Sequence, residues 1–219
     1  VQTCALPISG RRLIEDPMDV LVVGATGLIG TAISRALEEA GDRVIGAGRS
    51  GGDISVDLGD PESVRDAVAA AGEIDAIVCA AGIARFGAVQ ELGPEGYDSS
   101  FSNKFMGQVN LVRFGLGRVR TGGSFTLTSG TLSTRPSAGS VAVAAFGAAS
   151  EGFARAAALD LNGEYRINVV SPGWVAESRQ AAGLDPMPGI WAADLAQFYV
   201  RSVHGAATGE VWEAEGPLS

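Results

Sequence analysis

Three glycines stand between an apolar run and a helical pattern in residues 19–30, which read D-V-L-V-V-G-A-T-G-L-I-G. The unbroken apolar run is typical of a parallel strand buried on both faces, and the pattern after it ends at Gly41, a helix stop. Glycines in such a turn let the backbone approach a pyrophosphate, whose charge the helix N-terminus then meets. The alternative is a tight turn that binds nothing. The predicted binding residues of this turn are Gly24, Thr26, Gly27, Leu28, Ile29 and Gly30.

Arg49 follows the second predicted strand, residues 43–47. A dinucleotide-binding protein that prefers NAD places an acidic residue there for the ribose hydroxyls. A guanidinium would instead meet a 2′-phosphate with bidentate hydrogen bonds, and the neighbouring Ser50 would add another. An exposed loop arginine is the alternative interpretation. The cofactor that these two residues indicate is NADP.

Two further strand ends carry residues suited to the rest of a dinucleotide. Asp57, after the third strand, would accept the adenine amino group while Leu58 covers the ring, although Asp57 would serve equally well as a loop cap. The fourth strand ends in small residues that let a sugar and a nicotinamide lie close to the backbone, with packing of small residues as the alternative. These small residues are Ala80, Ala81 and Gly82.

The elements that must position these residues alternate between strands and helices. Such alternation requires right-handed crossovers and a parallel sheet covered on both faces. We therefore predict one doubly wound α/β domain with seven parallel strands over residues 18–219, preceded by a disordered or non-native arm at residues 1–17. Besides residues 20–23, the predicted strands are 43–47, 53–56, 74–79, 123–128, 165–170 and 210–214; after the first helix, the predicted helices are 61–71 with Asp60 as its cap, 94–117, 140–161 and 191–203.

Composition narrows the class of partner. The formal net charge of −9 argues against nucleic acid and anionic membrane surfaces, and no apolar run approaches the roughly 20 residues that span a bilayer. Two cysteines and one histidine offer too few ligands for a zinc site, so no metal is expected. Few cysteines also fit a reducing cytoplasm.

The motifs, taken in order, resemble the short-chain dehydrogenase/reductase family over residues 19–216. They read G-A-T-G-L-I-G, V-I-G-A-G-R-S, V-D-L, C-A-A-G, T-L-T-S-G and R-I-N-V-V-S-P-G. The resemblance implies a single Rossmann-type domain, a nicotinamide cofactor with a small-molecule substrate, and homodimers or homotetramers formed through helices 94–117 and 140–161. The middle glycine of the turn lies at 27, not 28, as in divergent branches of the family.

The same resemblance implies a catalytic set of asparagine, serine, tyrosine and lysine. Ser129 matches the serine that hydrogen-bonds the substrate carbonyl. The tyrosine and lysine positions fall on Val143 and Gly147, or in a register three residues later on Phe146 and Ser150. None of these residues is a proton donor of the required kind, so we predict that the usual pair is absent.

Lys104 is the candidate replacement for the missing proton donor. Counting back from Gly107 places it at the family's asparagine, with Asn103 beside it. A partly desolvated lysine has a lowered pKa and can donate a proton. The alternatives are a lysine on a solvated face or in a subunit contact.

The segment after the sixth strand completes the predicted site. By resemblance, the backbone of Pro172, Gly173 and Val175 would face the nicotinamide. The threonine with which the family holds the pyrophosphate falls at Glu177, which implies that the pyrophosphate is held more weakly on this side.

Three functions remain open. They are reduction of a small carbonyl compound with NADPH, NADP binding without turnover as a sensor or scaffold, and a non-redox reaction on the same fold.

Overall fold

The computed structural model describes residues 17–216 and shows a seven-stranded sheet in the order β3-β2-β1-β4-β5-β6-β7. All six neighbouring pairs are parallel. The predicted doubly wound α/β fold is therefore confirmed. Of the predicted N-terminal arm, residues 1–16 lie outside the described part of the chain. The strands are β1 Asp19–Val23, β2 Arg43–Gly48, β3 Ile54–Ser55, β4 Ile74–Cys79, β5 Val119–Thr128, β6 Arg166–Pro172 and β7 Val211–Ala214.

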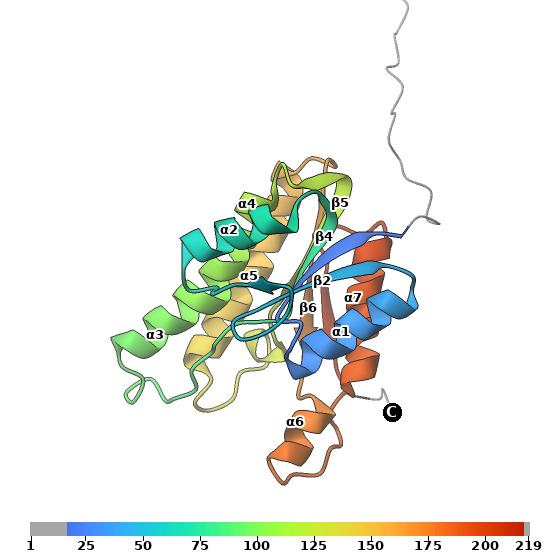
Figure 1. The fold of residues 1–219 in the computed structure, drawn as a ribbon. Coiled ribbons are helices and arrows are strands. Elements are labelled where there is room, and N and C mark those ends of the chain that lie inside the picture. The colour runs from blue at the N-terminus through green and yellow to red at the C-terminus, as the bar shows by residue number, and fades with distance from the viewer. Residues whose placement is uncertain (1–16, 217–219) are drawn as a thin grey trace, which may run out of the picture.

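Helices cover both faces of this sheet (Figure 1). No helix within residues 17–216 is both long and apolar enough to cross a bilayer. The α-helices are α1 Leu28–Glu39, α2 Pro61–Ala71, α3 Pro94–Ser100, α4 Gly107–Gly115, α5 Val141–Asp160, α6 Ala176–Ala181 and α7 Ala192–His204, with a π-helix at Phe101–Met106 and a 3₁₀ turn at Thr131–Ser133.

The strand pattern produces two separate hydrophobic cores because successive side chains point to opposite faces. In β1, Leu21 and Val23 pack toward α2, α4 and α5. Val20 and Val22 pack on the other face, toward α1 and α7. This two-sided burial explains why the strand reads as an unbroken apolar run.

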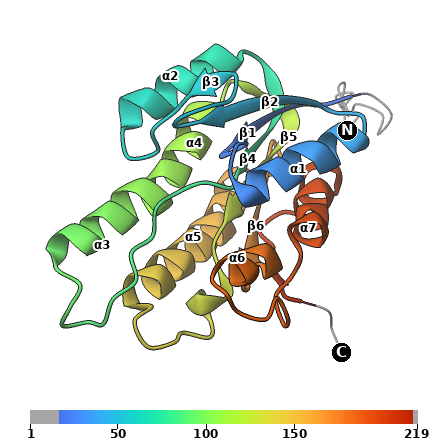
Figure 2. The same ribbon diagram turned by 60° about the horizontal axis from the view of Figure 1, so that its bottom comes forward.

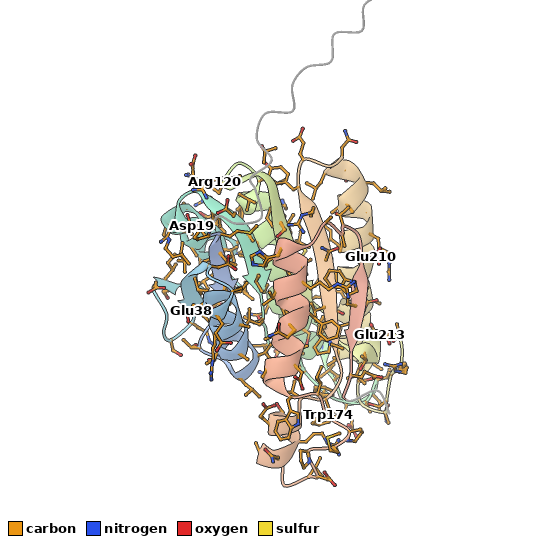
Figure 3. The ribbon with its side chains drawn as sticks, turned by 90° about the vertical axis from the view of Figure 1, so that its right-hand side faces the viewer. Asp19, Glu38, Arg120, Trp174, Glu210 and Glu213 are labelled. Atoms are coloured by element: carbon orange, nitrogen blue, oxygen red, sulfur yellow. The ribbon has the colours of Figure 1, made fainter. Side chains whose placement is uncertain are left out.

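The two ends of the sheet have different characters. Figure 3 shows Asp19 and Arg120 near the amino ends of the strands, where they form an ion pair of 3.5 Å, and Trp174 at the opposite end, next to α6. Figure 2 brings this opposite end forward, with α6 and the loops that follow the carboxyl ends of the strands. Ligands of open α/β sheets bind outside these carboxyl ends.

Three local features differ from the predictions. β5 begins at Val119 rather than residue 123, because Val119 already pairs with Ile74 before the register shifts. The helix expected over 94–117 ends at Gly115 and passes through a π-helical segment, an arrangement often found at functional sites. The short α6 was not expected at all.

Asp60 is an N-cap, as predicted, and its carboxylate accepts a hydrogen bond of 3.0 Å from the Glu62 N–H. We expect Asp60→Ala to lower the free energy of unfolding by about 1 kcal/mol, because this N–H would lose its partner. Urea denaturation measures the change. Asp66→Ala, on an exposed position of the same helix, is the matched control. An equal loss in both variants would contradict the capping role.

Candidate functional site

The glycine turn joins β1 to α1 at the carboxyl edge of the sheet. The Gly24 N–H donates to the Ala47 carbonyl (2.7 Å), and the Gly27 N–H donates to the Gly24 carbonyl (3.0 Å). Gly24 has a φ of +91°, and a Cβ there would lie 2.9 Å from the Cβ of Ala81. A Cβ at Gly30 would overlap the Gly24 carbonyl group. These contacts require glycine at 24 and 30 and hold the start of α1 directly against the turn.

A cavity of about 240 Å³ opens beside this turn. It is bounded by the ends of β1, β2 and β4 and by the loop after β3. A Cβ at Gly27 would have only the Gly24 carbonyl oxygen nearby, at 3.4 Å, so the turn leaves the cavity free of side chains there. Most of the predicted cofactor residues line it, namely Gly24, Thr26, Gly27, Arg49, Ser50, Asp57, Leu58, Ala80, Ala81 and Gly82.

Arg49 and Ser50 lie exposed at the edge of this cavity, directly after β2. Within residues 17–216, no carboxylate pairs with the Arg49 guanidinium. The group therefore has all its N–H donors available to an anion that enters the cavity. Its chemistry fits a phosphate ester.

Asn103 is a cavity residue that the sequence analysis did not assign. Its Oδ1 accepts from the Ile83 N–H (2.8 Å), and its Nδ2 lies 3.4 Å from Oδ1 of Asp57. Asp57 also accepts from the Gly59 N–H (2.9 Å), so it caps its own loop as well as lining the cavity. Asn103 thus connects the loops that follow β3 and β4. Its position within the π-helical segment, rather than any sequence motif, explains the contact.

Lys104, the one lysine of the chain, lies across the end of β4. Its Nζ donates to the Ala81 carbonyl (3.0 Å), and a Cβ at Gly82 would overlap the lysine side chain. Gly82 therefore makes room for Lys104, in addition to any room that it leaves for a ligand. Burial lowers the pKa of the Lys104 ammonium from its ordinary value of 10.5.

Ser129 directly follows β5 and is buried beside a carboxylate that the sequence analysis did not single out. Its hydroxyl donates to Oε1 of Glu151 (2.9 Å), and the Ser133 hydroxyl donates to the same oxygen (2.6 Å). Glu151 is only 4% exposed, and its other oxygen lies 3.8 Å from the Arg155 guanidinium. A glutamate in an alanine-rich helix carries no sequence signal for this contact, which arises only when α5 packs beside the end of β5.

The positions predicted for the tyrosine and lysine pair lie on the same helix, α5. Val143 is buried, and a Cβ at Gly147 would lie 3.1 Å from the Ser133 Cβ. The turn after β5 thus occupies the space into which a long side chain at 147 would extend. In the alternative register, Phe146 is buried and Ser150 donates back to its carbonyl (3.0 Å).

The predicted nicotinamide-facing residues lie at the end of β6 and just after it, but they do not line the 240 Å³ cavity. The Gly173 N–H donates to the Ala214 carbonyl, and Val175 is buried in a short bridge with Ile190. Nearby, both carboxylate oxygens of Glu177 accept from the Ala192 N–H at the start of α7, each at 3.1 Å. The predicted roles of Pro172, Gly173 and Val175 stay predictions.

The part of the chain that the structure describes holds no group of three His, Cys, Asp or Glu side chains arranged to bind a metal ion.

A parallel sheet with this strand order and a glycine turn at the carboxyl end of β1 defines a Rossmann-type α/β protein. The family model described as enoyl-(acyl carrier protein) reductase matches residues 24–202. The chain belongs to the short-chain dehydrogenase/reductase family of oxidoreductases, which bind NAD(P).

Individual relatives agree with this assignment. The chain is 30% identical over 193 residues to the 2,3-dihydro-2,3-dihydroxybenzoate dehydrogenase of Escherichia coli, covering 82% of this chain and 75% of the relative. The solved structure of the protein lin1944 from Listeria innocua is similar, with a TM-score of 0.85, 36% identity and coverage of 90% of this chain and 98% of that one. A small-chain dehydrogenase solved in complex with NADPH gives a TM-score of 0.82 at 28% identity, covering 92% and 98% of the two chains.

Proposed function

We propose that this oxidoreductase binds NADP(H) and reduces a small carbonyl compound with an unusual proton donor. The observation that carries the proposal is the Arg49 guanidinium, which has no carboxylate partner among the described residues and lies at the edge of a cavity that begins at the glycine turn. The small-chain dehydrogenase that was solved with NADPH, a relative of similar fold, supports the choice of cofactor. The residues present fit a dinucleotide, since a side-chain-free turn and an available cation meet its phosphates.

In this proposal the chain's own residues hold the substrate and supply a proton. The bound nicotinamide would provide the hydride. Ser129 would hold the carbonyl oxygen at the end of β5. Lys104, or a water molecule, would deliver the proton, because burial lowers the pKa of the Lys104 ammonium and so makes it a better proton donor.

A second candidate function is NADP binding without turnover, and one observation favours it. The Ser129 hydroxyl already donates to Glu151, and Lys104 already donates to the Ala81 carbonyl. A carbonyl substrate would have to draw both donors away from these partners. The residues at 143 and 147 supply no replacement if they occupy the catalytic positions.

Fluorescence titration of the purified protein with NADPH, followed by NADPH consumption with a panel of small aldehydes and ketones, separates the candidates. Binding with consumption supports the reductase. Binding without consumption across the panel favours the second candidate. Failure to bind NADPH or NADH would overturn both.

Lys104→Met tests the proton donor. We expect carbonyl reduction to fall about 10²–10⁴-fold, as for loss of a general acid, while NADPH still binds. In the wild-type protein, reduction should decline as the pH rises through the lowered pKa of Lys104, because only the ammonium form donates. Reductive ¹³C-methylation of the one lysine gives an NMR signal that reports this pKa directly. A pKa at or above 10.5, or an unchanged rate in the variant, would contradict the role.

We also propose self-association through the helical segment over residues 94–115 and through α5, as the family resemblance implies. Ala145 and Ala148 are exposed on α5 and Ala144 is half-buried beside them, and such small side chains permit close approach of a second helix. The dimer or tetramer stays a prediction.

A further inference from the structure

Glu177 lines a second cavity on the other side of the glycine turn. This cavity, of about 610 Å³, lies between the start of α1 and the start of α7. Thr26 and Gly27 line both cavities, so the turn forms a common border. A dinucleotide whose adenosine end lies near Arg49 would bring its diphosphate to this border, and its negative charge toward the second cavity.

The Glu177 carboxylate lies at the N-terminus of α7, where an anion could otherwise bind. Both of its oxygens accept from the Ala192 N–H, at 3.1 Å each, although the carboxylate comes from α6 and not from α7. The residue before Ala192, Trp191, provides no side-chain cap. Glu177 therefore satisfies a backbone donor that would otherwise be available to another anion.

The charge of Glu177 has no compensating cation among the described ion pairs. Arg35 is the basic residue that lines the same cavity, and its guanidinium is paired with Glu39 (2.7 Å). A diphosphate at the turn would thus meet an uncompensated carboxylate across the cavity. Both groups are anions, and like charges repel each other.

We infer that Glu177 sets the affinity for the cofactor by competing with its diphosphate for the space between α1 and α7. This inference rests on the proposed binding of NADP(H). It assigns to α6, the six-residue helix that carries Glu177, a part in setting how tightly the dinucleotide is held, beside that of Arg49.

Glu177→Gln is the decisive variant because glutamine keeps a carbonyl oxygen to accept from Ala192 and removes only the charge. We expect the Kd of NADPH, measured by fluorescence titration, to fall about tenfold, which corresponds to about 1.4 kcal/mol. The Kd of adenosine 2′-monophosphate, which lacks the diphosphate, should stay the same. Glu164→Gln removes an equal charge from an exposed position before β6, at the amino end of the sheet, and should leave both constants unchanged.

Each outcome bears on one claim. Unchanged or weaker NADPH binding in Glu177→Gln, or an equal gain in Glu164→Gln, would overturn the inference while leaving NADP(H) binding intact. Failure of the wild-type protein to bind either ligand would overturn the proposed function itself. If Glu177→Gln does not fold, as judged by circular dichroism, Glu177→Thr removes the same charge and is held to the same criteria.

Discussion

Arg49→Ala is expected to raise the Kd of NADPH about 10- to 100-fold while changing the Kd of NADH little. Hydrogen bonds to a charged group contribute about 1.5–3 kcal/mol, and each 1.4 kcal/mol is a tenfold change in affinity. The guanidinium lies exposed at the cavity edge, so its removal costs no packing within the protein. Fluorescence titration with both cofactors measures the two constants.

The control for Arg49→Ala is Arg118→Ala, which removes an equal charge from an exposed position before β5, at the other end of the sheet. It should leave both constants unchanged. An equal loss of NADPH and NADH affinity in Arg49→Ala would show that the Arg49 side chain does not bind the 2′-phosphate. The preference for NADP would then lose its main support.

Gly30→Ala is expected to lower the free energy of unfolding by about 3 kcal/mol, at the upper end of overpacking effects. The added Cβ would overlap the Gly24 carbonyl oxygen and lie 2.5 Å from the carbonyl carbon. Both atoms belong to backbone that is fixed by hydrogen bonds to the end of β2. The turn and α1 would therefore have to separate, and NADPH binding should be lost with them.

Gly152→Ala is the matched control and should change stability in the opposite direction. Gly152 lies on the exposed side of α5, with nothing within 4 Å of an added Cβ. Alanine there should stabilise the protein by about 0.5–1 kcal/mol, because glycine loses more backbone freedom on folding. Urea denaturation compares the two variants. A neutral Gly30→Ala would contradict the close contact between turn and helix.

The fold was predictable because its signals are local. The apolar run of β1, the glycine turn and the Asp60 cap each specify an element within a few residues. The start of β5 was not predictable, because Gly122 and Gly123 are typical of a turn. In the structure the strand passes through both glycines with a shift in register. The short α6 also escaped prediction, since six residues carry too little periodicity to identify a helix.

The candidate site also combines features that local sequence predicts with features that depend on tertiary packing. The places of Arg49 and the glycine turn beside the cavity were predictable, because each follows a strand and the carboxyl ends of parallel strands meet at one edge of the sheet. The contact of Glu151 with Ser129 and the bridge made by Asn103 depend on which elements pack together, and no spacing in the sequence encodes them. The same holds for Glu177, which caps a helix fifteen residues further along the chain.

The sheet has its two shortest strands at its edges. β3 has two residues and β7 has four. A strand this short exposes few unpaired backbone groups, so it offers a poor template for another chain to extend the sheet. Sheet continuation between molecules, and the aggregation that can follow from it, is therefore disfavoured by the architecture.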